Sequence, residues 1–290
     1  MFARSGHLLR TYWLETLMIL PLTMYIGLLT LVPVLQAIGL SFTDRYTGAF
    51  PTLSNYQYIT SRPDFSEAFI NTIGITLMSV TMEMTIGLIL ALMLAQQFRG
   101  RGLFRTIMLT PMGVPTLVAG AAMLYFFRTN GYLNEALLRL GVIDLPVYWM
   151  ESGLRGMFAV ALADMWKVTP IVVLLLLAGL EAIPGDVYEA ADVDGASRWE
   201  TFRSITLPLL MPAITMALIV RAIDAFRIFD VVMVMASRSI PVMSTFVYIN
   251  YFDFQDPYSA SAAATILLLM IVAFIALYFL VVERRRGDLE

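Results

Sequence analysis

Six long apolar runs constrain the fold of this chain more than any other feature of its sequence. They cover roughly residues 14–42, 67–97, 106–127, 156–180, 205–236 and 259–282. A helix needs about 20 apolar residues, each rising about 1.5 Å, to cross the hydrocarbon core of a bilayer. The composition agrees, because 59% of the residues are apolar and only 14% are charged, whereas soluble domains carry about 25% charged residues. The chain is therefore predicted to be an all-α polytopic membrane protein with six transmembrane helices.

The distribution of arginine predicts how these spans are oriented. With the N-terminus inside, the inner segments hold ten arginines and the outer segments hold six. Cytoplasmic loops carry the excess of basic residues. We therefore expect both termini and the loop at 181–204 to be cytoplasmic, in a protein that crosses the cytoplasmic (inner) membrane several times. The outer connections would lie near residues 43–66, 128–155 and 237–258.

Residue types that are absent or rare exclude several classes of site. With no cysteine, the chain has no disulfide, thiolate metal site or cysteine nucleophile. The lone histidine, His7, lies in the N-terminal tail, where a solvated residue is expected rather than a metal ligand. The net charge of −3 is too small to indicate a nucleic-acid partner. We expect no catalytic residue, cofactor or metal in this chain.

The single lysine excludes ATP binding of the common kind. A P-loop requires Gly-x-x-x-x-Gly-Lys-Ser/Thr, because its glycine amides and its lysine hold the phosphates. Lys167 lies in ADMWKVTP, with no such glycine before it and Val168 after it. If ATP drives this protein, another chain binds it.

Residues 184–212 are polar and acidic, and they predict a helix-turn-helix that cannot lie in hydrocarbon. Asp186 followed by Glu189, and Ser197 followed by Glu200, each fit the pattern of a capping box at a helix start. Two caps so close together indicate a loop with one defined shape.

The same loop has features that favour a docking surface. Gly195 suits the left-handed position that ends a helix, and the second helix is expected to stop at Pro208. The small Ala190, Ala191 and Ala196 would allow another surface to approach closely. The alternative is an ordinary interfacial hairpin that only joins two spans. Because a span connection needs only a few residues, we favour docking.

The order of residues in this loop resembles the EAA motif of permease subunits of binding-protein-dependent ABC importers. The matching positions are Glu189-Ala190-Ala191, then Gly195, then Ile205 and Leu207-Pro208, without insertion. The resemblance extends over roughly 65–285, and IDAFRIFD at 223–230 is similar to the carbohydrate-uptake branch of the family.

This resemblance implies a fold, a function and a set of partners. The chain would be a single transmembrane domain, 1–290, with the type I ABC importer permease fold, in which an N-terminal helix and outer loop (1–66) precede a permease core (67–285). It would form one half of the translocation pathway for a carbohydrate and catalyse nothing itself. Its partners would be a second permease subunit in a heterodimer, two ATPase subunits that bind ATP and Mg²⁺, and an extracytoplasmic solute-binding protein.

The resemblance also implies that the loop helix seats in a cleft of an ATPase subunit and transmits its closure to the spans. The residues expected at this contact are Glu189, Ala190, Ala191, Asp194, Gly195, Ala196 and Ser197.

Charged residues lie inside the predicted spans, where they are costly, so their presence needs an explanation. Two interpretations are possible. They are Glu83, Asp164, Lys167, Arg221, Asp224, Arg227 and Asp230. In one interpretation, neighbours three apart (Asp164 with Lys167, and the four in the fifth span) neutralise each other and join helices. In the other, they line a polar pathway for sugar hydroxyls. The structural interpretation is favoured for Glu83, Asp164 and Lys167, and both stay open for Asp224 and Arg227. The candidate pathway residues are Trp166, Asp224, Phe226, Arg227, Asp230, Tyr248 and Asn250, with Phe229 as an alternative to Trp166 or Phe226 for stacking on the ring face.

Two rival functions remain at this stage. An ion-coupled secondary carrier of a small polar solute could use Glu83, Asp164 or Asp224 for coupling. An intramembrane enzyme would need a nucleophile with a base, or a set of metal ligands, within the spans. The predicted spans contain no histidine, which disfavours the enzyme.

Overall fold

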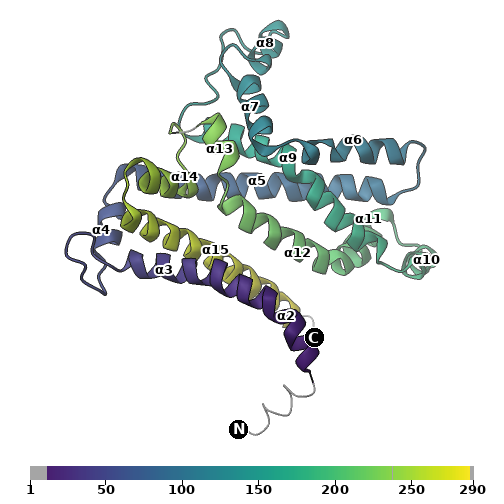
Figure 1. Cartoon of the computed structure of the whole chain (residues 1–290). Coiled ribbons are helices and arrows are strands. Elements are labelled where there is room, and N and C mark those ends of the chain that lie inside the picture. The colour runs from purple at the N-terminus through teal and green to yellow at the C-terminus, as the bar shows by residue number, and fades with distance from the viewer. Residues whose placement is uncertain (1–11, 237, 288–290) are drawn as a thin grey trace.

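Every regular element in the described part of the chain is helical. The computed structural model describes residues 12–236 and 238–287. Figure 1 shows long helices lying side by side, from which α7 (Thr116–Phe127) and α8 (Tyr132–Arg139) project as an arm. Residues 1–11 lie outside the described part, so the predictions for His7 and the N-terminal tail are not tested.

Within residues 12–236 and 238–287, five helices are long and apolar enough to cross a bilayer. The first, Trp13–Ser41, consists of α2 (Trp13–Ile26), a π-helical turn (Gly27–Leu31) and α3 (Val32–Ser41). The others are α5 (Pro63–Ala95), α9 (Leu154–Glu181), the helix Arg198–Phe226, and α15 (Pro257–Gly287) as far as Leu280. The prediction of an all-α polytopic membrane protein is confirmed, with a sixth span only if one broken helix pair is counted.

The predicted span 106–127 is that broken pair and not one straight helix. α6 (Arg101–Gly113) and the helices that follow it, Thr116–Arg139, are bent by 97°. Val114 takes an extended conformation, with φ −81 and ψ 130, directly before Pro115. Proline has no N–H to continue a helix and disfavours the helical conformation in the residue before it. The chain therefore leaves the helix at this point.

The predicted span 205–236 also ends early. α12 (Leu207–Phe226) stops, and a separate short helix, α13 (Asp230–Met235), begins after three residues. The Ser244 hydroxyl donates a hydrogen bond to the Ile228 carbonyl in the break, and α13 packs against α7. Contacts between distant segments therefore turn the chain at a point where its apolar pattern continues.

The core lies where α5, α9 and α12 pack against one another. Its buried apolar residues include Ala91, Leu94, Val172, Val173, Leu176, Leu210 and Ala217. A second cluster, around α9 and α13, includes Ala159, Val160, Ile228, Val232, Ile240 and Val242. Lipid tails are as apolar as these side chains, so close packing rather than transfer from water favours the helix contacts.

The first span lies at one edge of the molecule, where α3 packs along α15 (Figure 1). Most of its large apolar side chains are exposed, as expected for a helix that faces lipid. The connections after the first span, after α7 and after α13 contain short helices. These are α4 (Ser54–Thr60), α8, and α14 (Met243–Tyr248) with a π-helical turn at Ile249–Asp253.

Candidate functional site

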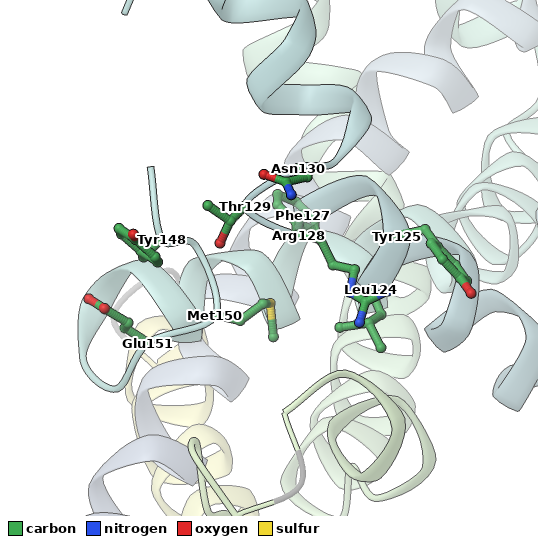
Figure 2. A pocket seen from close by; sticks show the side chains of 9 residues that line it. All are labelled: Leu124, Tyr125, Phe127, Arg128, Thr129, Asn130, Tyr148, Met150 and Glu151. Carbon is green, nitrogen blue, oxygen red and sulfur yellow. The ribbon is translucent and has the colours of Figure 1, made fainter. Parts of the chain in front are cut away.

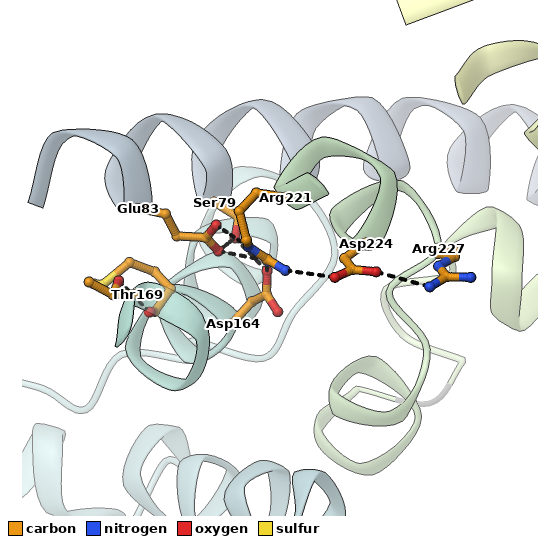
Figure 3. A network of polar contacts seen from close by, with 8 residues as sticks. Ser79, Glu83, Asp164, Thr169, Arg221, Asp224 and Arg227 are labelled. Carbon is orange, nitrogen blue, oxygen red and sulfur yellow. Dashed lines mark hydrogen bonds and ion pairs between the residues drawn. The ribbon is translucent and has the colours of Figure 1, made fainter. Parts of the chain in front are cut away.

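A buried ion cluster joins three core helices. Arg221 of α12 donates from Nε to Glu83 Oε2 of α5 at 2.7 Å, and from Nη2 to Glu83 Oε1 at 3.1 Å. The same Nη2 lies 3.3 Å from Asp164 Oδ2 of α9. All three residues are buried, and Figure 3 shows their side chains converging between the helices. A guanidinium that binds a carboxylate through two nitrogens makes one of the strongest side-chain contacts in proteins.

Ser79 links the two carboxyl groups of this cluster. Its hydroxyl oxygen lies 2.7 Å from Glu83 Oε1 and 2.6 Å from Asp164 Oδ2. The predicted pairing of Asp164 with Lys167 along α9 is wrong, because Asp164 pairs with Arg221 on another helix. A charge inside a membrane is tolerated when it is paired. This arrangement supports the structural interpretation of Glu83 and Asp164.

The cluster continues outward as a row of alternating charges (Figure 3). Arg221 Nη1 lies 3.4 Å from Asp224 Oδ2, and Arg227 Nη2 donates to Asp224 Oδ1 at 3.0 Å. Side-chain exposure rises from 2% at Arg221 to 42% at Asp224 and 64% at Arg227. The predicted pairing of neighbours three residues apart is confirmed for these residues. Asp230 does not continue the row, because it begins α13.

A cavity of about 330 Å³ opens over the outer part of this row. Its charged lining consists of Asp164, Lys167, Arg221, Asp224, Arg227 and Asp230. Thr116, directly after the α6–α7 break, also lines it, and so do the residues that flank the α12–α13 break. Substrate and ion sites of transporters are typically formed by such discontinuous helices near the middle of the membrane. Among the described residues, no three His, Asp or Glu side chains gather as a metal site would require.

Lys167 stabilises one of these breaks. Its Nζ donates to the Val114 carbonyl at 2.6 Å, at the end of α6. Carbonyl groups at a helix end lack a partner within the helix, so a side-chain donor can satisfy them. The lysine was singled out in the sequence, but its partner lies 53 residues away. No local pattern could have identified this contact.

Two aromatic residues predicted for the pathway do not line this cavity. Trp166 borders a separate, mainly apolar cavity with Met123 and Phe126. Phe226 is buried against Phe274 of α15, with ring centroids 5.5 Å apart. Successive residues on a helix point about 100° apart, so the neighbour of a lining residue faces another side. The aromatic residue that does line the cavity is Phe229.

Tyr248 and Asn250 lie in the connection that carries α14. The Tyr248 ring is 5.2 Å from the Phe229 ring, so it approaches the cavity only through that residue. Asn250 is buried, accepts from Arg62 Nη1 at 2.9 Å, and donates to the Phe246 carbonyl at 2.8 Å. Its amide is thus engaged in holding the connection together.

Arg45, just after the first span, links that span to the start of α15. Arg45 pairs with Asp256 at 2.5 Å and stacks on Tyr58, with its Cζ 4.2 Å from the ring centroid. Burial alone would raise the pKa of Asp256, but hydrogen bonds from Ser259 and the charge of Arg45 outweigh burial and hold that pKa below its usual value. The carboxylate therefore stays ionised and paired at neutral pH.

The acidic hairpin lies at the end of the molecule opposite α4 and α14 (Figure 1). It contains α10 (Gly185–Val193) and α11 (Arg198–Thr201). Gly195 has φ +75 between them, so its predicted left-handed conformation is confirmed. The capping box of Ser197 and Glu200 is also confirmed, with both of its hydrogen bonds present.

Two predictions for the hairpin are wrong. Asp186 is not an N-cap, because α10 begins at Gly185 after Pro184 and has no side-chain cap. Asp186 lies instead in the first turn, where negative charge favours a helix start. Pro208 does not stop the second helix, since a π-helical turn (Phe202–Thr206) leads directly into α12. Pro208 follows directly after that π-helical turn, where the regular hydrogen-bond pattern of the helix is already interrupted.

Most of the residues predicted for ATPase coupling are accessible. Glu189, Ala190, Asp194, Gly195 and Ser197 are exposed, Ala196 is half-buried, and Ala191 is buried within the hairpin. Val193 and Trp199 were not predicted as contacts, although they are 87% and 66% exposed on the same hairpin. The sequence feature that could have identified both residues is an apolar side chain isolated among charged residues.

Comparison with known proteins places these features in a family. Residues 83–287 match the family described as the inner membrane component of binding-protein-dependent transport systems. This region includes the ion cluster, the cavity and the hairpin. The chain belongs to this family. The resemblance inferred from the EAA motif is thereby confirmed.

Relatives of this permease are similar along most of its length. It is 38% identical over 282 residues to the trehalose/maltose transport system permease protein MalF of Thermococcus litoralis, covering 93% of this chain and 94% of that protein. It is 36% identical over 244 residues to the trehalose transport system permease protein SugA of Mycobacterium tuberculosis, covering 82% and 78% of the two chains.

A solved structure supports the type I importer fold. A chain of a bacterial ABC transporter involved in the import of alginate superimposes with a TM-score of 0.81, at 22% identity, covering 97% of this chain and 99% of that one. Family membership and fold together identify a non-catalytic, multi-pass permease subunit of the membrane, as predicted. The ion-coupled carrier is not favoured.

Proposed function

We propose that this permease carries a neutral carbohydrate as one half of the pathway of an ATP-driven importer. The balance of charge in the cavity is the observation that carries this proposal. Its lining holds three basic residues, Lys167, Arg221 and Arg227, and three acidic ones, Asp164, Asp224 and Asp230. Such a lining offers many hydrogen-bond donors and acceptors without an excess of either charge. The relatives described above, which are permease proteins of trehalose/maltose and trehalose transport systems, support the same class of solute.

The charged residues in and beneath the cavity divide into a fixed part and an accessible part. Glu83, Arg221 and Asp164 hold α5, α9 and α12 together as one unit. Asp224, Arg227 and Asp230 lie toward the opening and exchange hydrogen bonds with sugar hydroxyls, while Phe229 presents an apolar ring. The solute crosses when this unit rocks against the second permease subunit around the cavity.

Coupling to ATP takes place at the hairpin. In this proposal the exposed Glu189, Ala190 and Gly195 seat in an ATPase subunit, and the apolar Val193 and Trp199 add contact area. Each half of a heterodimeric permease engages one ATPase, which binds ATP and Mg²⁺. The binding protein delivers the sugar at the opposite face.

Asp224→Asn should reduce sugar uptake more than it reduces assembly. The substitution removes a charge that faces the cavity but leaves the buried cluster paired. We expect a fall of about tenfold in trehalose or maltose uptake by the reconstituted complex, which corresponds to about 1.4 kcal/mol. The chain offers a matched control in Asp253→Asn. Asp253 pairs with an exposed arginine, Arg238, as Asp224 pairs with Arg227, and it is also 42% exposed, but it does not line the cavity.

Equal uptake by the Asp224 and Asp253 variants would remove Asp224 from the pathway. Sugar uptake that persists without ATP and collapses with an uncoupler would overturn the proposal itself in favour of an ion-coupled carrier.

The orientation of the chain predicts which surface positions react from outside the cell. Because the chain has no cysteine, each variant carries a single thiol. Val193→Cys on the hairpin and Leu145→Cys before α9 are matched, at 87% and 77% exposure. With cytoplasmic termini, a membrane-impermeant maleimide should label Leu145→Cys in intact cells, and Val193→Cys only after lysis. Labelling of Val193→Cys from outside would contradict the assignment of the hairpin to the cytoplasm.

A further inference from the structure

One buried side chain holds together the two walls of a second cavity. Asn134 of α8 donates to the Thr129 carbonyl at 2.9 Å and to the Val147 carbonyl at 2.8 Å. Its own carbonyl accepts from Val147 N at 3.1 Å and from Trp149 Nε1 at 3.0 Å. The three bonds to Val147 and Trp149 tie the segment after α7 to the segment before α9, and the bond to Thr129 fixes Asn134 within the first of these segments. A cavity of about 680 Å³ lies between them (Figure 2).

The turn at the base of this cavity is also specifically built. The buried Phe127 packs against Trp149, with ring centroids 6.2 Å apart. A Cβ on Gly131 would lie 2.4 Å from the Tyr125 carbonyl oxygen and 2.7 Å from that of Arg128. Only glycine permits so close an approach of backbone to backbone. The cavity is therefore part of the folded structure and not a gap between loose loops.

Most of the polar side chains that line the cavity do not bond to other residues of the fold. Within the described part of the chain, Arg128, Asn130, Tyr148 and Glu151 make no side-chain hydrogen bond or ion pair, although Arg128 lies over the Tyr125 ring at 5.4 Å. Figure 2 shows Tyr125 and Tyr148 on opposite sides of the cavity, with Arg128 and Asn130 between them. Both tyrosines are exposed. By contrast, Asn134 in the same connection is buried and has partners on both its side-chain nitrogen and its side-chain oxygen.

We propose that this cavity is a carbohydrate subsite, separate from the cavity over the charge row. The inference rests on the proposed function and adds a second position for the same solute. Tyrosine rings offer flat faces to the C–H side of a sugar ring, and their hydroxyls remain free to bond. A guanidinium, a carboxylate and an amide add donors and acceptors for vicinal hydroxyls. The volume lies in the range of about 300–1,000 Å³ that is typical of small-ligand pockets.

The lining selects an uncharged sugar over an anion. Of the described residues that line it, Arg128 and Glu151 are the charged ones, and they are opposite in sign. The cavity lies in the connection between α7 and α9, at the arm that projects away from the acidic hairpin (Figure 1). A sugar released by the binding protein therefore occupies this subsite before it reaches the cavity between α9 and α12.

Photo-crosslinking of the assembled transporter tests the subsite directly. The probe is trehalose that carries a diazirine, and mass spectrometry locates the label. We expect labelled peptides from residues 124–151, competed by free trehalose. In Tyr125→Ala/Tyr148→Ala the labelling should fall about tenfold. Tyr132→Ala is the matched control, because Tyr132 is an exposed tyrosine of the same arm that does not line the cavity.

The kinetics of uptake give a second readout. We expect the double variant to raise the sugar concentration for half-maximal uptake about tenfold, with maximal ATPase stimulation by the loaded binding protein unchanged. Weaker capture of the binding protein, with the crosslink retained, would show that the cavity is a protein docking site and would overturn the subsite. Crosslinks confined to α9 and α12 would overturn the subsite while leaving the proposed function intact. A wild-type complex that transports no sugar would instead refute the proposed function.

Discussion

Replacing Arg221 with methionine should prevent the permease from folding stably in the membrane. The variant leaves Glu83 and Asp164 buried without their cation. Removing one partner of a buried ion pair typically costs about 3–5 kcal/mol, a large share of the stability of a protein. We expect a strong loss of purified protein and a lower unfolding midpoint in detergent.

Arg227→Met is the matched control for this prediction. Both arginines pair with Asp224, but Arg227 is 64% exposed and Arg221 is 2% exposed. An exposed pair contributes only about 0–1 kcal/mol, so the control should fold normally. The triple variant Glu83→Gln/Asp164→Asn/Arg221→Met should recover part of the lost stability, because no unpaired charge remains. Equal stability of the two single variants would show that the buried cluster does not hold the three helices together.

Gly195→Val should separate the permease from the proposed ATPase partner while leaving the permease inserted in the membrane. At φ +75 a side chain with a Cβ is strained, at a cost of about 1–2 kcal/mol. Apart from Gly195 and its two chain neighbours, no atom of the described residues lies within 4 Å of the position that a Cβ would take. The added side chain therefore projects into the surface that the ATPase would occupy. We expect ATPase co-purification and uptake to fall at least about tenfold.

Gly48→Val separates backbone strain from docking. Gly48 has φ +69 and equally open surroundings, but it lies before α4 at the opposite end of the molecule. The two variants should lose similar stability, and only Gly195→Val should lose the ATPase. If both variants retain the ATPase, the hairpin is a simple connection between spans.

The helices and the hairpin were the most predictable parts of this permease. Within the described residues, long apolar runs located four spans to within a few residues, because crossing a bilayer requires backbone hydrogen bonds within each segment, whereas the run 205–236 was placed too far along the chain. Gly195 and the pair Ser197 and Glu200 were predicted correctly because their roles depend on neighbours within a few positions. Asp186 was misassigned because acidic residues also occur in the first turn of a helix, and Pro208 was misassigned because the π-helical turn before it lets the helix continue.

The candidate site was predictable in its residue types but not in its geometry. Charges in the spans indicated that Glu83, Asp164 and Arg221 matter, yet their pairing joins residues 57 to 138 positions apart. The sequence placed Trp166 and Phe226 on the pathway, whereas the structure turns one toward a separate apolar cavity and the other toward α15.

By itself, the sequence determined that this chain spans a membrane in helices, and that a capped acidic hairpin interrupts them. Those features depend on local hydrogen bonding and on the cost of placing polar groups in lipid. Tertiary structure alone decided where the spans break, which charges pair and where the cavities open. Lys167 reaches the end of α6 and Ser244 reaches the break after α12 only because separate helices pack together. A contact between distant segments leaves no periodic pattern in either of them, so only the folded chain reveals it.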